Sequence, residues 1–133
     1  MAKELKIGIE EKLSVAVNNK NTAIACGSGS VSVFATPALV ALMEGAAISA
    51  VDQLLEAGFT TVGTEINVKH LAATPVGMNV TATAQLIDID GKRLLFKVEA
   101  RDDVDLIGTG THERYIIRVD SFIARASGKL SKE

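Results

Sequence analysis

The 133-residue chain has one cysteine, two histidines, no tryptophan and only 4% aromatic residues. The single cysteine, Cys26, excludes an internal disulfide and fits a reducing compartment. With so few aromatic residues and no basic run, the chain lacks the features of a nucleic-acid groove. The two histidines are far apart and have no metal-ligand spacing with the cysteine. We therefore expect no nucleic-acid partner and no bound metal.

Several common functional motifs are also missing. The glycines near residue 28 do not form a phosphate-binding loop, and no Gly-x-Ser-x-Gly nucleophile elbow occurs. Residues 1–8 lack the apolar core of a signal peptide. The longest apolar run is shorter than the roughly 20 residues that a membrane-spanning helix needs. These absences predict a cytoplasmic protein that does not enter a membrane.

The composition, 47% hydrophobic and 23% charged with a formal net charge of −2, is that of a globular protein. A chain of this length is expected to form one domain. We place this single domain over residues 1–133, with its core at about 12–119 and a C-terminal extension at 120–133.

A long apolar helix is the strongest structural signal. The run from Pro37 to Val51 contains only two polar side chains, one of which is Glu44. Thr36 followed by proline predicts the start of the helix, with Thr36 as its N-cap. Gly58 predicts the C-cap, so we expect the helix to reach about residue 57. A helix that is apolar on nearly every side must be covered on every side.

Alternating β-branched and apolar residues predict an antiparallel sheet. Strands are expected over residues 12–17, 59–71, 78–89, 92–101 and 106–119, and a short helix over 121–129. Gly108 and Gly110 are interpreted as possible bulges in the last strand. The predicted fold is α+β, a curved antiparallel sheet of about five strands wrapped around the long helix. Because one small sheet cannot cover that whole helix, we expect association through the sheet edge or the helix.

Glu44 is the first candidate functional residue, because burial disfavours a carboxylate that has no partner. Carboxylates in such settings are often functional, although a structural carboxylate bound to backbone or to a neighbouring chain is the alternative. Thr36 either only caps the helix or also helps to bind an oxyanion at the helix N-terminus. His70 either faces water at the end of its strand or acts in catalysis. His112, in a regular strand, is interpreted as structural.

Gly63 and the helix geometry add two constraints. Glycine inside a strand is costly unless another group must approach closely. Thr36 and Glu44 are eight positions apart, which is about 12 Å of rise in a helix, so they cannot touch in one straight helix. Three arrangements would still let Thr36 and Glu44 share one site: an irregular first turn, an elongated substrate, or a site built from residues of two chains. Our preferred arrangement has His70 bridging the two.

Two segments together resemble a known family. They are Phe34-Ala-Thr36-Pro-Ala-Leu-Val-Ala-Leu-Met-Glu44 and Val62-Gly63-Thr-Glu-Ile-Asn-Val-Lys-His70-Leu-Ala-Ala-Thr-Pro-Val-Gly77. This combination resembles the hot dog-fold thioesterases, and within them the fluoroacetyl-CoA thioesterase-like branch. The resemblance covers about residues 12–119.

The resemblance implies a hot dog fold and dimers with active sites at the interface. It implies that Thr36, Glu44 and His70 are catalytic, and that Gly63 accommodates the acyl thioester. We also expect Phe34 to contact the substrate. In the fluoroacetyl-specific enzyme a lid carries paired phenylalanines, whereas here Phe34 is the only aromatic residue before Phe59.

The predicted function is hydrolysis of a small or medium acyl-CoA thioester to a free acid and CoA, without a cofactor, in a homodimer or a tetramer. His70 would be the general base, Glu44 would orient it, and Thr36 would be nucleophile or carbonyl binder. A non-catalytic acyl-CoA-binding protein is the alternative. A hydratase is weaker, since the Asp and His pair typical of those enzymes is missing. The basic residues available for the CoA phosphates are Lys69, Lys92, Arg93, Arg101 and Arg114.

Overall fold

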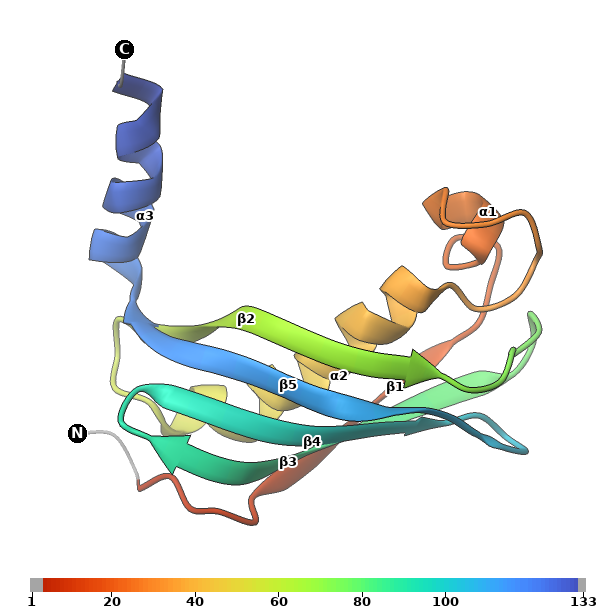
Figure 1. The fold of residues 1–133 in the computed structure, drawn as a ribbon, viewed down its shortest axis with the longest axis horizontal. Helices are drawn as coiled ribbons and strands as arrows, with labels where there is room; N and C mark the ends of the chain where they lie inside the picture. Colours follow the sequence, from red (N-terminus) through yellow and green to blue (C-terminus); the bar gives the residue numbers. More distant parts are fainter. Residues whose placement is uncertain (1–3, 132–133) are drawn as a thin grey trace.

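The computed structural model describes residues 4–131 as a five-stranded antiparallel sheet with a long helix against one face (Figure 1). The strand order is β1-β3-β4-β5-β2. The strands are β1 (Glu10–Ala16), β2 (Phe59–His70), β3 (Asn79–Asp90), β4 (Arg93–Arg101) and β5 (Leu106–Arg118). The helices are α1 (Ala23–Cys26), α2 (Thr36–Val51) and α3 (Val119–Ser127), with 3-10 turns η1 (Asp52–Leu54) and η2 (Gly128–Ser131). The predicted α+β hot dog architecture is confirmed.

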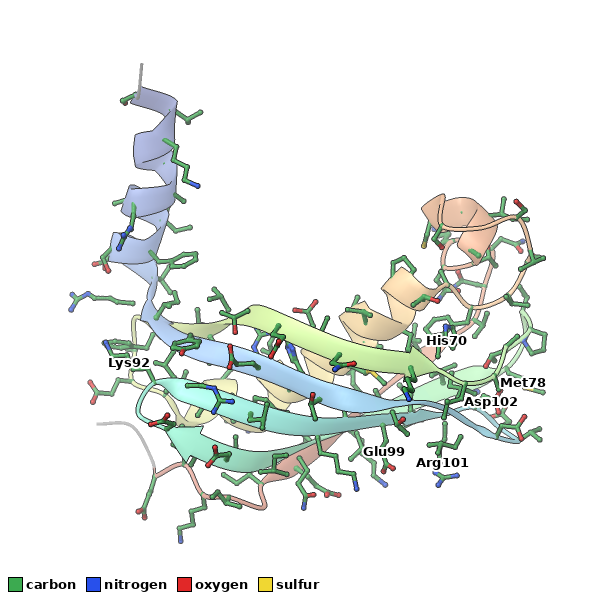
Figure 2. The ribbon with its side chains drawn as sticks, viewed as in Figure 1. His70, Met78, Lys92, Glu99, Arg101 and Asp102 are labelled. Carbon is green, nitrogen blue, oxygen red and sulfur yellow. The ribbon has the colours of Figure 1, made fainter. Side chains whose placement is uncertain are left out.

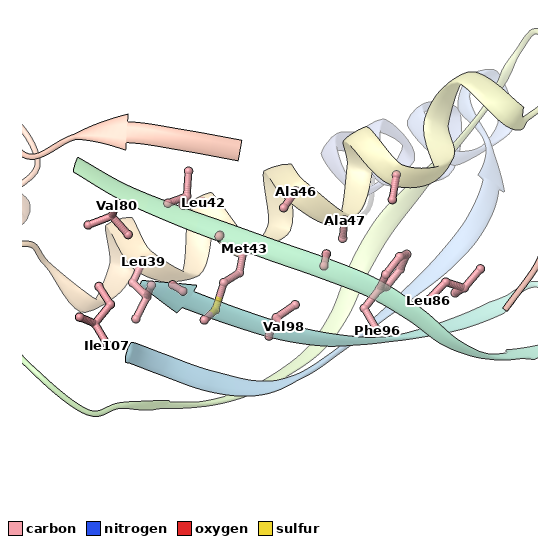
Figure 3. Close-up of a cluster of buried hydrophobic side chains, with 14 of the residues drawn as sticks. Leu39, Leu42, Met43, Ala46, Ala47, Val80, Leu86, Phe96, Val98 and Ile107 are labelled. Atoms are coloured by element: carbon pink, nitrogen blue, oxygen red, sulfur yellow. The ribbon is translucent and has the colours of Figure 1, made fainter. Parts of the chain in front are cut away.

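The alternating patterns in β3 and β4 explain where the core lies. Every second residue of β4, and of β3 as far as Leu86, points toward α2 and is buried, while the residues between them are more exposed. These core residues are Val80, Ala82, Ala84, Leu86, Leu94, Phe96, Val98 and Ala100. From the helix side, Leu39, Met43 and Ala47 fill the space between the two layers (Figure 3). Burial of these apolar side chains is the main force that holds α2 against the sheet.

One face of α2 remains uncovered in the single chain, as expected for a helix that one small sheet cannot cover. Pro37, Ala41 and Ile48 are exposed, and the Glu44 side chain keeps 38% of its surface accessible. These positions recur at intervals of three or four residues, so they share one side of the helix. The reason is that α2 packs mainly against β1 and β3 and has few contacts with β2 at the far edge.

By length and composition alone, the segment Thr36–Leu54 is long and apolar enough to cross a membrane. The apolar run from Pro37 to Val51, on which the sequence prediction rests, is shorter than this segment. Its buried side chains instead form the centre of the fold. The apolar character of the segment is therefore accounted for by packing against the sheet.

Both ends of α2 differ from the prediction. Ala35 occupies the N-cap position with an extended backbone, and Thr36 is already the first helical residue, so Thr36 is not the cap. The helix ends at Val51 and tightens into η1, well before residue 57. The Asp52 carboxylate accepts a hydrogen bond from the Thr60 hydroxyl at 2.6 Å, which ties this turn to the start of β2. A tertiary contact therefore replaces the last predicted helical turns.

The predicted bulge at Gly110 is wrong, because β5 pairs regularly there with both neighbouring strands. Next to Gly108 the pairing of β5 with β4 does shift, between Ala100 and Arg101. Two further irregularities lie in β2, between Gly63 and Glu65, and in β3 after Leu86. Both β5 glycines are also closely packed. A Cβ at Gly108 would lie 3.0 Å from a methyl of Leu39, and one at Gly110 would collide with the carbonyl oxygen of Asn67.

The C-terminal helix α3 begins two residues earlier than predicted and extends away from the sheet, past the β2 edge (Figure 1). Val119, Phe122 and Ile123 lie on one side of it at spacings of three and four residues. Their exposed fractions are 40%, 41% and 57%. No α3 residue is buried, so the part of the chain that the structure describes covers the apolar side of this helix only partly.

We predict that Gly110→Ala destabilises the protein by at least about 2 kcal/mol, because the new methyl collides with backbone that cannot rotate away. The urea midpoint of unfolding measures this loss. Gly128→Ala is the matched control, since a Cβ there meets nothing within 4 Å. A Gly110→Ala variant that unfolds at the parental urea concentration would contradict the packing explanation.

Candidate active site

Thr36 and His70 meet where the start of α2 passes the end of β2. The Thr36 Oγ1 atom lies 2.8 Å from His70 Nδ1, within hydrogen-bonding distance. Figure 2 shows His70 at the end of β2, on the same side of the molecule as the start of α2. Thr36 is free to make this contact because its hydroxyl is not used to cap the helix. The sequence prediction that these two residues share a site is consistent with this geometry.

Three hydrogen bonds hold the segment that follows His70. The Leu71 N–H donates to the Ile107 carbonyl oxygen at 2.7 Å, and the Phe34 N–H donates to that of Thr74 at 2.8 Å. The Thr74 hydroxyl donates to the Asp102 carboxylate at 2.8 Å. These contacts connect β5, the segment before α2 and the β4–β5 turn to one short loop. The position of the His70 ring therefore depends on four parts of the chain.

A pocket of about 390 Å³ opens beside the Thr36–His70 pair. Its apolar walls include Val31, Val33 and Leu71, and Phe34 forms part of its lining although its side chain is only 1% exposed. A mostly apolar pocket with two convergent polar groups is typical of a small-molecule site. Phe34 therefore adjoins the pocket, and its contact with a substrate stays a prediction.

The His70 imidazole is poorly solvated on its far side. Its Nε2 atom is buried and has no hydrogen-bond partner within residues 4–131. Burial lowers the pKa of His70 below its ordinary 6.5, because desolvation disfavours the charged imidazolium. A neutral imidazole with one nitrogen next to a hydroxyl can accept a proton at that nitrogen. Nε2 then carries a hydrogen that requires an acceptor.

Glu44 lies in a separate cluster on the same helix. Its Oε2 atom is 3.4 Å from Arg114 Nη1 and 3.8 Å from His112 Nε2. Among the described residues, Glu44 makes no ion pair or hydrogen bond with His70. We expected His70 to contact both Thr36 and Glu44. Within a single chain, it contacts Thr36 but not Glu44. The cause is the axial separation already implied by the helix rise.

Gly63 explains how the Glu44 carboxylate reaches the sheet. A Cβ at Gly63 would lie 2.6 Å from Glu44 Oε2, which is closer than real Cβ contacts. Any side chain here would displace the carboxylate. The expectation that this strand glycine permits a close approach agrees with this geometry, and the approaching group is Glu44.

Arg114 was considered as a CoA-binding cation, but it is 4% exposed and cannot serve at a pocket mouth. Its Nε and Nη2 atoms donate to the hydroxyl and the carbonyl oxygen of Thr61, at 2.7 and 2.9 Å. Its Nη1 also donates to His112 Nε2 at 3.0 Å. The alternation of side chains along a strand indicates only that His112 and Arg114 lie on one face of β5. Nothing in the sequence placed that face against Glu44.

His112 is 1% exposed, and its Nδ1 donates to the Glu65 carbonyl oxygen at 2.8 Å. Burial is the main cause that lowers the pKa of His112, and the nearby Arg114 charge adds to it. His112 is therefore a neutral imidazole with a fixed tautomer, in which Nε2 is an acceptor. This contact accounts for its interpretation as a structural residue.

Of the other basic candidates, Arg93 is paired with Glu113 and Asp88 on the sheet. Lys69, Lys92 and Arg101 are exposed. Within residues 4–131, no group of three or more His, Cys, Asp or Glu side chains is placed to hold a metal ion.

Comparisons with known proteins agree with this geometry. A family model described as fluoroacetyl-CoA-specific thioesterase matches residues 17–120. The fluoroacetyl-CoA thioesterase of Streptantibioticus cattleyicolor is 48% identical over 97 residues, which cover 73% of this chain and 70% of that protein. A solved structure of the fluoroacetyl-CoA thioesterase FlK superposes with a TM-score of 0.91 at 38% identity, covering 96% of this chain and 98% of that one.

A Thermus thermophilus member of the thioesterase superfamily superposes with a TM-score of 0.88 at 27% identity, covering 98% of each chain. The family match spans most of the chain, and the relatives share both its sequence and its architecture. The chain therefore belongs to the fluoroacetyl-CoA-specific thioesterase family and is a thioester hydrolase.

Proposed function

We propose that the protein hydrolyses a small or medium acyl-CoA thioester to a free acid and CoA in a homodimer. Each site would combine Thr36 and His70 of one chain with Glu44 of the second copy. The observation that carries this proposal is the buried Nε2 of His70, which has no partner within residues 4–131. A carboxylate accepting its hydrogen would complete a Thr–His–Glu arrangement of the kind used in acyl transfer.

Proton transfer follows from this arrangement. With Nε2–H directed to the partner's Glu44, Nδ1 carries a lone pair and faces the Thr36 hydroxyl at 2.8 Å. His70 takes a proton through Nδ1 when the nucleophile attacks the thioester carbonyl, and it returns that proton to the departing CoA sulfur. The Glu44 carboxylate stabilises the imidazolium formed in between. The acyl group leaves as the carboxylic acid after water has attacked.

The nucleophile is either Thr36 or a water molecule. In the first case the Thr36 oxygen forms an acyl-enzyme, and in the second it only orients the carbonyl. In both cases the N–H groups of the first turn of α2 are placed to stabilise the oxyanion, because they have no acceptors within their own helix. Single-turnover trapping of an acyl group on Thr36 distinguishes the two routes.

The second copy is supported by two uncovered surfaces of one chain. The side of α2 that carries Glu44 is otherwise apolar and exposed at Pro37, Ala41 and Ile48. Next to it, β2 is an edge strand of twelve residues with unpaired backbone groups on its outer side. Antiparallel pairing of β2 with its copy, with Gly63 opposite the partner's His70, would bring Glu44 to the unpaired imidazole nitrogen.

The substrate class follows from the family and the pocket. The characterised relative acts on fluoroacetyl-CoA. In this chain, Phe34 in the pocket wall is the only aromatic residue before Phe59. We propose small to medium acyl groups as substrates, with exposed lysines or arginines meeting the CoA phosphates. The single free thiol at Cys26 agrees with a cytoplasmic location.

We predict that His70→Ala lowers the turnover of acyl-CoA esters by about 10²–10⁴-fold, because a positioned general base is lost. Thiol release from acetyl, fluoroacetyl, medium-chain and aryl esters measures this effect and identifies the preferred acyl group. Lys97→Ala, a change of an exposed residue on β4, is the control. Parental turnover by His70→Ala would disprove the assigned role.

We predict that a mixed dimer of one His70→Ala chain and one Glu44→Ala chain recovers activity that neither variant has alone. If each site uses residues from both chains, one of the two sites in the mixed dimer carries both changes and the other is intact. Co-expression with two different affinity tags isolates the mixed species for the assay. Inactivity of the mixed dimer, with both parents folded and dimeric, would place the whole site in one chain.

We predict that Glu44→Gln moves the acidic limb of kcat/KM to lower pH while lowering its maximum. A neighbouring carboxylate favours the imidazolium and raises the pKa of His70, whereas burial lowers it. Without the carboxylate, burial acts alone, so the imidazole stays neutral and active at lower pH. A limb that stays in place would show that Glu44 does not act on His70.

A further inference from the structure

The helix α3 carries an apolar side that the proposed mechanism does not use. Val119, Phe122 and Ile123 lie on that side and remain exposed. A cleft of about 590 Å³ lies between α3 and the sheet, with Phe59, Ile117 and Phe122 in its walls. The described part of the chain therefore leaves room for another apolar surface against this side of the helix.

The pocket beside Thr36 and His70 is also open on its outer side. Val31 and Leu71 line this pocket, and each is more than half exposed. Val76, which follows the same segment, is exposed as well. Val31, Leu71 and Val76 form a second apolar surface, the pocket rim.

Both surfaces lie beyond the β2 edge of the sheet, at opposite ends of that strand (Figure 1). The start of α3 is fixed next to the first residue of β2, because the Val119 N–H donates to the Gly58 carbonyl oxygen at 2.9 Å. Most of the pocket rim follows the last residue of β2, His70. The twelve residues of β2 extend over about 35 Å, so α3 cannot close the pocket of its own chain.

Antiparallel pairing of β2 with a second copy brings the two surfaces together, because it reverses the strand. In the register with Gly63 opposite the partner's His70, Phe59 comes to lie near the partner's Thr74. The start of α3 is then next to the partner's pocket rim. Nine helical residues extend about 13 Å, and neighbouring strands are about 5 Å apart, so α3 is long enough to cross the partner's segment.

We propose that α3 of one chain packs on the pocket rim of a second copy, so that Phe122 and Ile123 form the outer wall of the partner's thioesterase pocket. This inference rests on the proposed function, because it uses the same pairing of β2 that brings Glu44 to His70. The partner's Leu71 would enter the cleft between α3 and the sheet. Because a two-fold dimer repeats every contact, both pockets gain the same wall.

Phe122→Ser tests the wall. This change is expected to raise KM for acyl-CoA esters about tenfold, since a large apolar contact with the bound substrate is lost. The value of kcat should change much less, because no atom of α3 takes part in proton transfer. Ala124→Ser is the matched control, since Ala124 lies on the opposite side of the same helix. Sedimentation velocity identifies the protein concentrations at which each variant is dimeric, and the kinetics are measured there.

A mixed dimer of one His70→Ala chain and one Phe122→Ser chain shows which chain supplies the wall. The only site with a working His70 is then on the Phe122→Ser chain. If α3 acts on the partner, the intact α3 of the other chain covers this site, and KM returns to the parental value. A KM as high as that of the Phe122→Ser homodimer would place α3 on its own chain and overturn the proposal.

Cys26 gives a second readout that does not depend on activity. It is the single cysteine of the chain and is exposed at the end of α1. Ile123→Cys adds a cysteine on α3, and a short bismaleimide should then join two chains into a covalent dimer. The same treatment of Ile123→Cys combined with Cys26→Ser should give no such product. Glu11→Cys, on the opposite edge strand β1, is the control and should not exceed the parental level.

The outcomes distinguish this proposal from the function on which it rests. If the parental protein releases no thiol from any acyl-CoA ester, the proposed function fails, and the cross-link still tests the docking of α3. If the parent is active, either a parental KM for Phe122→Ser or the absence of the cross-linked dimer overturns the proposal. The apolar side of α3 would then serve a different partner.

Discussion

The carboxylate of Glu44 on an apolar helix is the constraint on which the site depends. A charge at this position is costly, so the sheet supplies a buried arginine at 3.4 Å and a strand without a side chain at Gly63. These adaptations occur on β5 and β2, which lie side by side at one edge of the sheet. Arg114 thus offsets the free-energy cost of placing the Glu44 charge on the helix. The Glu44 side chain is 38% exposed, so its carboxylate remains accessible to another group.

Much of the fold could be predicted from the sequence because local pattern and global architecture agree. Alternation in β3 and β4 matches their buried faces, and strand limits differ by only a few residues from those expected. The errors occur where tertiary contacts override local signals. Thr36 resembles a cap but bonds to His70, and the helix stops where Asp52 bonds to Thr60. Gly110 of β5 resembles a bulge, but it pairs regularly and its missing side chain makes room for β2.

The site shows the same division. The sequence motif contains Thr36, Glu44, Gly63 and His70. The rise of the helix correctly predicts that Thr36 and Glu44 do not touch. The contacts of Arg114 with Thr61 and Glu44 could not be predicted from the sequence, because they depend on which residues of β2 lie opposite β5. Register across a sheet depends on bulges such as the one after Gly63, which sequence periodicity does not reveal. Long-range pairing is therefore the information that a single sequence lacks.

The helix α3 has a different consequence. It has nine residues, and isolated helices shorter than about 12–15 residues are only marginally stable in water. Within residues 4–131 its apolar side is only partly covered, so its sequence alone does not guarantee its helical form. We therefore expect the stability of the helical form of α3 to depend on the surface that packs against its apolar side. We expect the helix content of this segment, measured by circular dichroism, to rise when another surface covers its apolar side.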